Sequence, residues 1–133
     1  MVEEQWKFLQ DIALLIQYAN RIGVVLTAGE AYRTHDQQLL YYYGKTLRLE
    51  NGEIELYDAP KRSWTMRSRH LNRLAMDFNF FIDGKLVYDE KNPKLIQLGE
   101  FWENLDEMNE WGGFWSKPDT PHFQRNLDAV HKV

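Results

Sequence analysis

Apolar residues recur at helical spacing in two long segments of the chain. The first segment, residues 3–21, is followed by Gly23 as a C-terminal cap. Its predicted inward stripe is Leu9, Ile12, Ala13, Ile16 and Ala19. The second segment begins at Asn92-Pro93, an N-cap and first-turn pair, and extends to about residue 109. Its apolar stripe is Leu95, Leu98, Trp102, Leu105 and Met108. Both stripes predict amphipathic helices that each bury one face.

Shorter stretches alternate between apolar and polar residues, which predicts strands. Residues 47–56 alternate on both sides of Asn51-Gly52, and this is the strongest short signal for a β-hairpin. Residues 74–81 alternate again. Asp83-Gly84 then turns that strand into a second predicted hairpin with residues 85–88.

Two further elements are predicted between the first helix and the first hairpin. Residues 24–27 form a short β-branched run that predicts a buried strand. Thr34 and Gln37 make a capping box for a helix that Gly44 can end. Helices and antiparallel hairpins thus mix without a repeating β-α-β order, so we predict the α+β class.

The length of 133 residues suits one compact domain, and we expect residues 1–133 to form a single monomeric domain. A formal net charge of −4 counts against a general nucleic-acid binder. The longest apolar run near the N-terminus, residues 12–16, is too short for a signal-peptide core or a membrane span. We therefore expect synthesis in the cytoplasm without a signal peptide.

Charge is unevenly distributed along the chain. Five basic residues and no acid lie between Asp58 and Asp77: Lys61, Arg62, Arg67, Arg69 and Arg73. Five acids and no base lie between Leu95 and Ser116: Glu100, Glu103, Asp106, Glu107 and Glu110. We interpret the acidic run as a solvated helix face, whereas the basic run leads directly into residues that could carry chemistry.

Because the chain contains no cysteine, a metal site would have to use histidine and carboxylate ligands. The histidines are His35, His70, His122 and His131. Asp77 interrupts an apolar segment, where a carboxylate is costly to bury unless it binds a metal or pairs with an arginine; the residues leave both alternatives open. The Gly- and Pro-rich residues 111–124 present Asp119 close to His122. Two histidines and a carboxylate would suit a catalytic zinc, with a second carboxylate left as a base.

In four segments the sequence resembles the D-alanyl-D-alanine carboxypeptidase-type zinc peptidases. Residues 68–77 are similar to their S-x-H-x-x-G-x-A-x-D signature, with Arg73 in place of the glycine. Residues 119–124 resemble the D-x-P-H-F-[EQ] ending of the L-alanyl-D-glutamate endopeptidase branch, which includes phage endolysins. The preceding Glu-Trp-Gly-Gly, residues 110–113, is typical of the same branch. Residues 30–38 are similar to the family's segment around its active-site arginine.

The resemblance implies a Hedgehog/DD-peptidase-like fold, with a small antiparallel sheet flanked by helices, and one bound Zn²⁺. It implies three zinc ligands, His70, Asp77 and His122. It also implies that Asp119 is the general base and that Arg33 binds the scissile carbonyl or the oxyanion. The residues alone also allow Arg33 to pair with Asp36 or Glu30.

The function that the resemblance implies is hydrolysis of an amide in the stem peptide of bacterial peptidoglycan. It favours L-alanyl-D-glutamate endopeptidase activity in an endolysin-like role, with action at the cell wall after release from the cytoplasm. Two alternatives stay open: D-alanyl-D-alanine carboxypeptidase or dipeptidase activity on the same site, and a non-catalytic, zinc-stabilised wall-binding module. The Asn51-Gly52 hairpin belongs to none of the motifs.

Overall fold

A computed structural model describes residues 1–128. Its α-helices are α1 (Val2–Arg21), α2 (His35–Tyr43) and α3 (Pro93–Leu105). Its strands are β1 (Val25–Ala28), β2 (Lys45–Glu50), β3 (Glu53–Asp58), β4 (Ala75–Ile82), β5 (Lys85–Val87), β6 (Asn109–Trp111) and β7 (His122–Arg125). Two 3₁₀ turns, η1 (Arg69–Asn72) and η2 (Gly112–Phe114), complete these elements. The predicted α+β class is confirmed. Within the described residues, no helix combines the length and the apolar character needed to cross a membrane.

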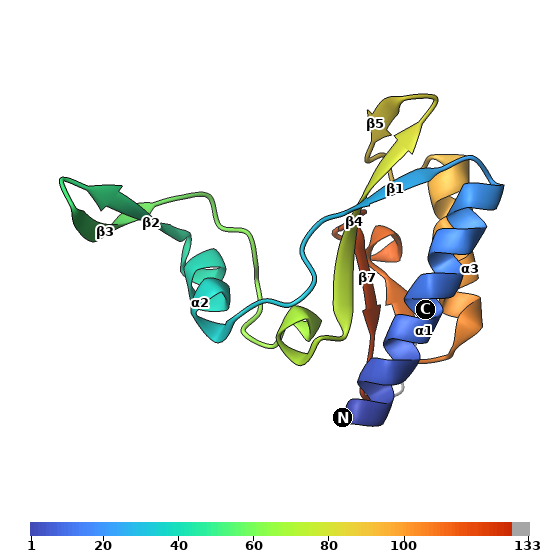
Figure 1. Cartoon of the computed structure of the whole chain (residues 1–133), viewed down its shortest axis with the longest axis horizontal. Helices are drawn as coiled ribbons and strands as arrows, with labels where there is room; N and C mark the ends of the chain where they lie inside the picture. The colour runs from blue at the N-terminus through green and yellow to red at the C-terminus, as the bar shows by residue number, and fades with distance from the viewer. Residues whose placement is uncertain (129–133) are drawn as a thin grey trace.

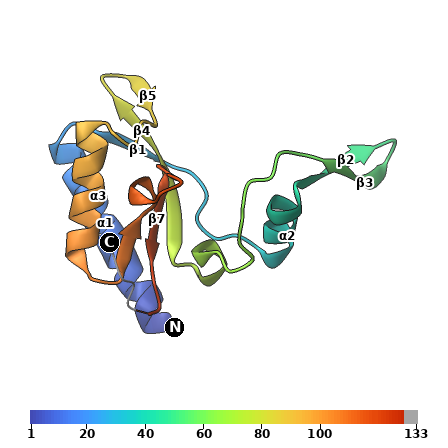
Figure 2. The same ribbon diagram turned by 180° about the vertical axis from the view of Figure 1, so that it is seen from behind.

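The body of the protein is an antiparallel sheet covered on one face by two helices. The strand order is β1-β4-β7-β6, and β5 pairs with β4 beside this path. Helices α1 and α3 lie side by side against the sheet (Figures 1 and 2). The core fills the space between these two layers. Its largest fully buried side chains include Trp102, Trp111, Phe80 and Phe123.

The buried face of α1 differs from the predicted stripe. Its buried side chains are Phe8, Ile12, Leu15 and Ala19. Leu9 and Ile16, which were predicted to face inward, are 61% and 40% exposed. The ring of Phe8 packs edge-on against Trp102 of α3, with 5.7 Å between the centroids. Several overlapping apolar stripes run along this helix, and the contact with α3 selects one of them.

Two other predicted elements were wrong in part. Strand β1 is not buried: it pairs at the sheet edge with β4, and Val25 is 59% exposed, while the preceding Val24 is fully buried. Helix α3 ends four residues earlier than predicted, because Asp106 has the extended angles φ −160° and ψ 141°. The chain then forms β6, which pairs with β7.

Arg125, at the end of β7, forms ion pairs with a residue near the start of α1 and with a residue just after α3. It is 3% exposed, and its guanidinium contacts Glu4 of α1 at 2.7 Å and Asp106 at 3.0 Å. Burial opposes the ionisation of Asp106, but bonds from the Met108 amide and from Arg125 hold the pKa of Asp106 below its usual value. Asp106 therefore belongs to a structural ion pair and not to the solvated helix face that was predicted.

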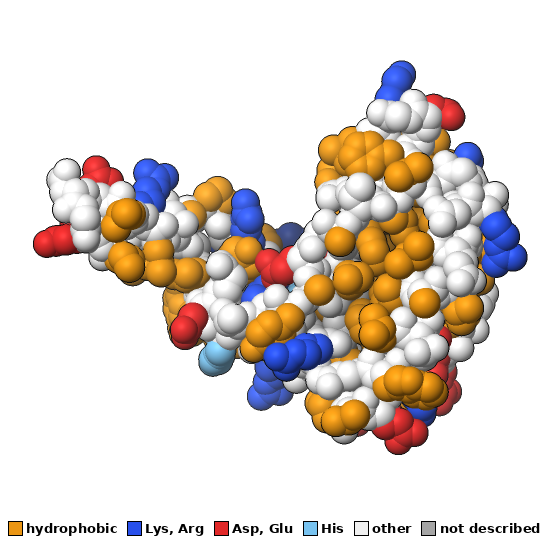
Figure 3. Space-filling model, in the orientation of Figure 1, with side chains coloured by type: hydrophobic (Ala, Val, Ile, Leu, Met, Phe, Trp, Pro, Cys, Tyr) orange, Lys and Arg blue, Asp and Glu red, His pale blue; other side chains and the backbone are white. Residues whose placement is uncertain are grey.

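Helix α2 and the β2–β3 hairpin form an arm that projects from the body (Figures 1 to 3). Thr34 caps α2 as predicted, since its Oγ1 accepts from the Gln37 amide at 3.2 Å, and Gly44 ends α2 at φ 67°. The predicted hairpin is confirmed, with Leu47 opposite Leu56 and Leu49 opposite Ile54. All four of these side chains are more than half exposed.

Candidate metal and catalytic site

Strands β4 and β7 place two of the candidate ligands opposite each other. Asp77 pairs with His122 in the antiparallel register, so both side chains point to the same face of the sheet. The neighbouring pair, Met76 and Phe123, points to the opposite face, where Phe123 is fully buried against Trp102. The candidate site therefore lies on the sheet face that α1 and α3 leave uncovered.

His70 reaches this face from the 3₁₀ turn η1. Ser68 caps the turn, because its Oγ accepts from the His70 amide at 3.2 Å. The turn ends at Arg73, which has the left-handed angles φ 60° and ψ 33°. This is the position of the glycine in the family signature, and a non-glycine residue costs about 1 kcal/mol there. The Arg73 guanidinium lies 4.0 Å from the centroid of Tyr32.

The segment before α2 is hydrogen-bonded to the backbone of two of the three candidate ligands, Asp77 and His70. The Gly29 amide donates to the Asp77 carbonyl at 2.7 Å, and the Asp77 amide donates to the Glu30 carbonyl at 2.8 Å. Three residues later, the Arg33 amide donates to the carbonyl of His70 at 3.2 Å. These bonds hold Arg33 beside the cluster although it lies far from Asp77 in sequence.

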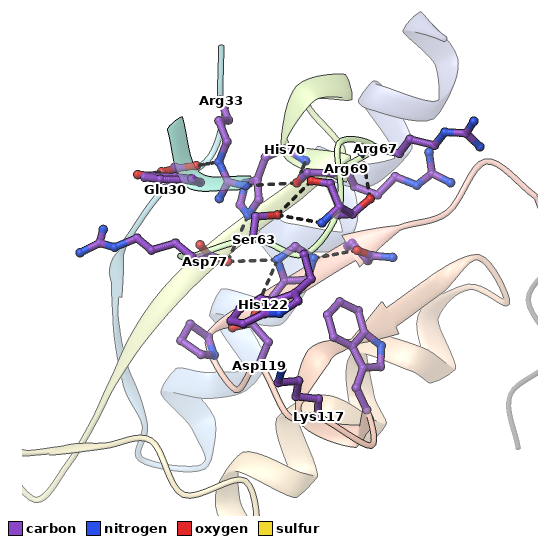
Figure 4. Close-up of a pocket in the computed structure, with 18 of the residues that line it drawn as sticks. Glu30, Arg33, Ser63, Arg67, Arg69, His70, Asp77, Lys117, Asp119 and His122 are labelled. Carbon is purple, nitrogen blue, oxygen red and sulfur yellow. Dashed lines mark hydrogen bonds and ion pairs between the residues drawn. The ribbon is translucent and has the colours of Figure 1, made fainter. Parts of the chain in front are cut away.

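The ligand atoms of His70, Asp77 and His122 converge to within 4.8 Å of one another (Figure 4). Asp77 Oδ1 lies 3.3 Å from His70 Nε2 and 3.2 Å from His122 Nδ1. A tetrahedral zinc ion with bonds of 2.0–2.1 Å separates its ligand atoms by about 3.3 Å. The two separations therefore suit shared coordination of one zinc ion.

Hydrogen bonds on the far side of each imidazole set which nitrogen carries the proton. His70 Nδ1 lies 2.6 Å from the Ala31 carbonyl oxygen, which can only accept. His70 therefore donates from Nδ1, and in the neutral ring Nε2 presents a lone pair to Asp77. His122 Nε2 lies 2.7 Å from Gln124 Oε1, which leaves Nδ1 facing Asp77.

A carboxylate at the end of a hydrogen-bond chain fixes the direction of the bond from His122. Gln124 Nε2 donates to Asn126 Oδ1 at 2.7 Å, and Asn126 Nδ2 donates to Glu110 Oε2 at 2.8 Å. Because a carboxylate only accepts, each amide must turn its oxygen toward His122. Trp115 Nε1 donates to the other oxygen of Glu110 at 2.5 Å. We call Gln124, Asn126 and Glu110 the Glu110 relay.

The three groups form a donor set that a cation fits. Two neutral imidazoles aim their lone pairs at a carboxylate, and a divalent ion between them would be stabilised by all three. A proton can occupy the same place. Although burial opposes both charges, the bonds between Asp77 and the two histidines hold the pKa of Asp77 well below its usual range. The contact with Asp77 likewise holds the pKa of His122 above its usual value.

Asp119 borders this cluster on the side of the cleft. Its Oδ2 lies 4.0 Å from His122 Nδ1, and its side chain is 53% exposed. The Asp119 amide donates to the Gly112 carbonyl at 2.9 Å, and a Cβ on Gly112 would lie 2.3 Å from the Asp119 carbonyl oxygen, so only glycine fits there. Partial burial, joined by the nearby charge of Asp77, raises the pKa of Asp119 although His122 opposes the shift.

Arg33 is held rigidly at the opposite wall of the cleft. Its Nε pairs with Glu30, its Nη1 donates to Gln38 Oε1 at 2.7 Å, and its guanidinium lies 4.8 Å from the Tyr41 ring centroid. Of the two acidic partners that the sequence allowed, the structure shows Glu30 and not Asp36. This pairing orients Arg33 toward the cleft, so it is compatible with the implied role in binding substrate.

A cleft of about 1070 Å³ joins all these groups. Its lining includes every residue for which the resemblance implies a role: Arg33, His70, Asp77, Asp119 and His122. Trp115 also lines it, whereas Trp111 is fully buried in the core. His35 is exposed on α2 away from the cluster, and His131 lies outside the described residues. Sequence reasoning missed Gln38, because nothing local marks a helical glutamine as a partner of Arg33.

Comparisons with known proteins agree with the sequence resemblance. The model of a peptidase family described as D-alanyl-D-alanine carboxypeptidase matches residues 61–125, a segment that contains the three candidate ligands and Asp119. The solved structure of the L-Ala D-Glu endopeptidase ChiX from Serratia marcescens is similar to this fold, with a TM-score of 0.63 and 22% sequence identity. The match covers 90% of this chain and 78% of that chain. No curated protein matches the sequence.

Proposed function

We propose that this chain is a member of the D-alanyl-D-alanine carboxypeptidase family of peptidases, whose model matches residues 61–125, and that it is a zinc-dependent hydrolase of the peptidoglycan stem peptide. One observation carries the proposal. Three ligand atoms converge on one point, with the Asp119 carboxylate 4.0 Å from His122 Nδ1, inside a cleft large enough for a peptide. We further propose that residues 1–133 act as a single monomeric catalytic domain.

His70, Asp77 and His122 would hold the zinc ion through Nε2, a carboxylate oxygen and Nδ1. When bound, zinc lowers the pKa of a coordinated water to about 7 and polarises the scissile carbonyl. Proton transfer and stabilisation of the negative charge are carried out by side chains of the protein.

Asp119 acts as the general base: it takes a proton from the attacking water and later delivers it to the leaving amine. Burial raises the pKa of Asp119, and a more basic carboxylate takes up a proton from water more readily. General-base catalysis contributes about 10²- to 10⁴-fold in rate. Arg33, held by Glu30 and Gln38, stabilises the negative charge that develops on the carbonyl oxygen.

Within this family we propose L-alanyl-D-glutamate endopeptidase activity in an endolysin-like role at the cell wall. The proposal is supported by residues 110–113 and 119–124, which resemble that branch, and by the fold shared with the Serratia endopeptidase. Mass spectrometry of digested muropeptides tests the bond. A released stem that begins at D-glutamate supports the proposal, whereas free D-alanine or its dipeptide supports the carboxypeptidase or dipeptidase alternative.

Zinc dependence and the role of Asp119 can be tested together. We expect protein purified without added metal to contain about one zinc per chain, and we expect a chelator to abolish hydrolysis of purified sacculi. The Asp119→Asn variant should retain zinc and lose at least about 100-fold in kcat. Comparable turnover in this variant would exclude Asp119 as the base. A chain without zinc would overturn the proposed metal chemistry, and zinc binding without any hydrolysis would favour the wall-binding module.

A further inference from the structure

Four basic side chains line the cleft without forming an ion pair to any acid in residues 1–128. They are Arg62, Arg67, Arg69 and Lys117. Arg69 Nη1 makes one contact, to Asn72 Oδ1 at 3.4 Å, and the Arg62 guanidinium lies 5.7 Å from the Tyr41 ring centroid. Neither contact neutralises a positive charge.

Two of the three acids that line the same cleft already contact other side chains. Glu30 pairs with Arg33, and Asp77 lies between the two histidines of the cluster. The third acid of the cleft, Asp119, forms no ion pair with a lysine or arginine within residues 1–128. The cleft is therefore locally positive although the whole chain carries −4. A divalent ion at the cluster would make it more so.

These cations come from two segments that meet across the cleft mouth. Arg62 and Arg67 lie in the segment between β3 and η1, Arg69 begins η1, and Lys117 lies in the loop that follows η2. The segments meet at Trp64, whose ring centroid is 4.0 Å from Lys117 Nζ. Trp64 is 63% exposed and also lines the cleft, so it offers apolar surface between the cations. Figure 3 shows Lys and Arg side chains gathered where the arm joins the body.

We propose that Arg62, Arg67, Arg69 and Lys117 form a carboxylate-binding subsite for an acidic peptide, with Trp64 as its apolar contact. The proposal rests on the proposed function, because these cations line the same cleft as the hydrolytic cluster and their ligand must then be part of the molecule that is cut. A substrate cleaved beside glutamate carries a free carboxylate close to the scissile amide. Guanidinium groups bind carboxylates through paired hydrogen bonds, which suits this assignment.

The experiment compares two synthetic stem peptides of equal length, one with free side carboxylates and one with the same groups amidated. We expect the wild-type zinc enzyme to show a lower KM for the free-carboxylate peptide. Arg67→Gln, Arg69→Gln and Lys117→Gln should each raise this KM about 2- to 5-fold, as expected for partly exposed ion pairs, with kcat unchanged. The KM for the amidated peptide should not move. Binding to the zinc-loaded Asp119→Asn variant, measured by calorimetry, should show the same preference.

Two control variants remove a charge outside the cleft: Arg48→Gln on the arm and Lys85→Gln on β5. If these raise KM as much as the cleft variants do, the effect is a long-range charge effect and the subsite is overturned. Equal KM values for the two peptides in wild-type enzyme would also overturn it, while leaving the proposed hydrolysis intact. A soluble phosphate polymer can be added as a competitor at the same charge concentration as the free-carboxylate peptide. If the polymer inhibits hydrolysis as strongly as that peptide does, the cations bind wall polymers instead. Absence of hydrolysis with both peptides, together with retained carboxylate-dependent binding, would contradict the proposed function alone.

Discussion

Replacing Gln124 with alanine removes the oxygen that accepts from His122 Nε2 at 2.7 Å. His122 is only 5% exposed, so water cannot easily replace the lost acceptor. A buried donor without a partner costs about 1–3 kcal/mol. The relay behind Gln124 then no longer favours the tautomer whose Nδ1 faces Asp77. Loss of such outer-shell bonds typically weakens metal binding about 10- to 100-fold, which equals about 1.4–2.8 kcal/mol and agrees with the hydrogen-bond cost.

The assay is a zinc titration in competition with a chromophoric chelator. We expect Gln124→Ala to bind zinc about 10- to 100-fold more weakly than wild type. Gln124→Glu keeps an acceptor at the same position and should stay close to wild type. Gln97→Ala, on the exposed face of α3, is the matched control for loss of a glutamine side chain. Thermal melting in excess chelator separates an effect on metal affinity from an effect on folding.

The reasoning is refuted if Gln124→Ala binds zinc as tightly as wild type while it remains folded. A second result would contradict the relay specifically. Glu110→Gln can turn a donor toward Asn126 and so no longer fixes the direction of the chain. If this variant weakens zinc binding no more than Gln97→Ala does, the carboxylate end of the relay has no influence on His122.

Three predictions concern the stability of the fold. Bonds from the Met108 amide and from Arg125 hold the pKa of Asp106 below its usual value, so the ion pair of Asp106 with Arg125 stabilises the fold above about pH 4 and is lost as the pH falls further. The difference in unfolding free energy between wild type and Arg125→Met, measured by urea titration, should therefore shrink as the pH falls below about 4. Gly99→Ala should cost about 1–3 kcal/mol in the same assay, since its Cβ would lie 2.0 Å from Trp111 Cε3. Arg73→Gly should change stability by less than about 1 kcal/mol, whereas Arg73→Val should cost more, because a β-branched residue resists φ 60°; equal effects of the two would contradict the assigned strain.

The elements that were predicted correctly are those with strong local signals. The N-cap at Thr34, the Asn51-Gly52 turn and the Asn92-Pro93 start of α3 each act through neighbouring residues, and the structure has all of them. The short strands β6 and β7 have only three and four residues, too few to show alternation, and they form because they pair with each other and with β4. Their existence depends on tertiary contacts that no local pattern encodes.

The candidate site divides in the same way. The motifs named every residue to which the resemblance gives a role, and the structure brings them to one cleft. The groups that orient them come from afar: Gln38 is on α2, and the Ala31 carbonyl that fixes His70 lies 39 residues away in sequence. Glu110 was within a recognised motif, but its bond to Asn126 requires the pairing of β6 with β7. Such partners become visible only when the chain is folded.

The register that sets Asp77 opposite His122 has a consequence for how this chain can change its length. The 44 residues between the two include the β4–β5 turn, the start of α3 and the loop after η2, and insertions there leave the pairing untouched. One added residue inside residues 75–77 or 122–124 would instead turn one of the two side chains to the opposite face and separate the pair. Length variation among related chains should therefore be concentrated in the connections and absent from these two triplets.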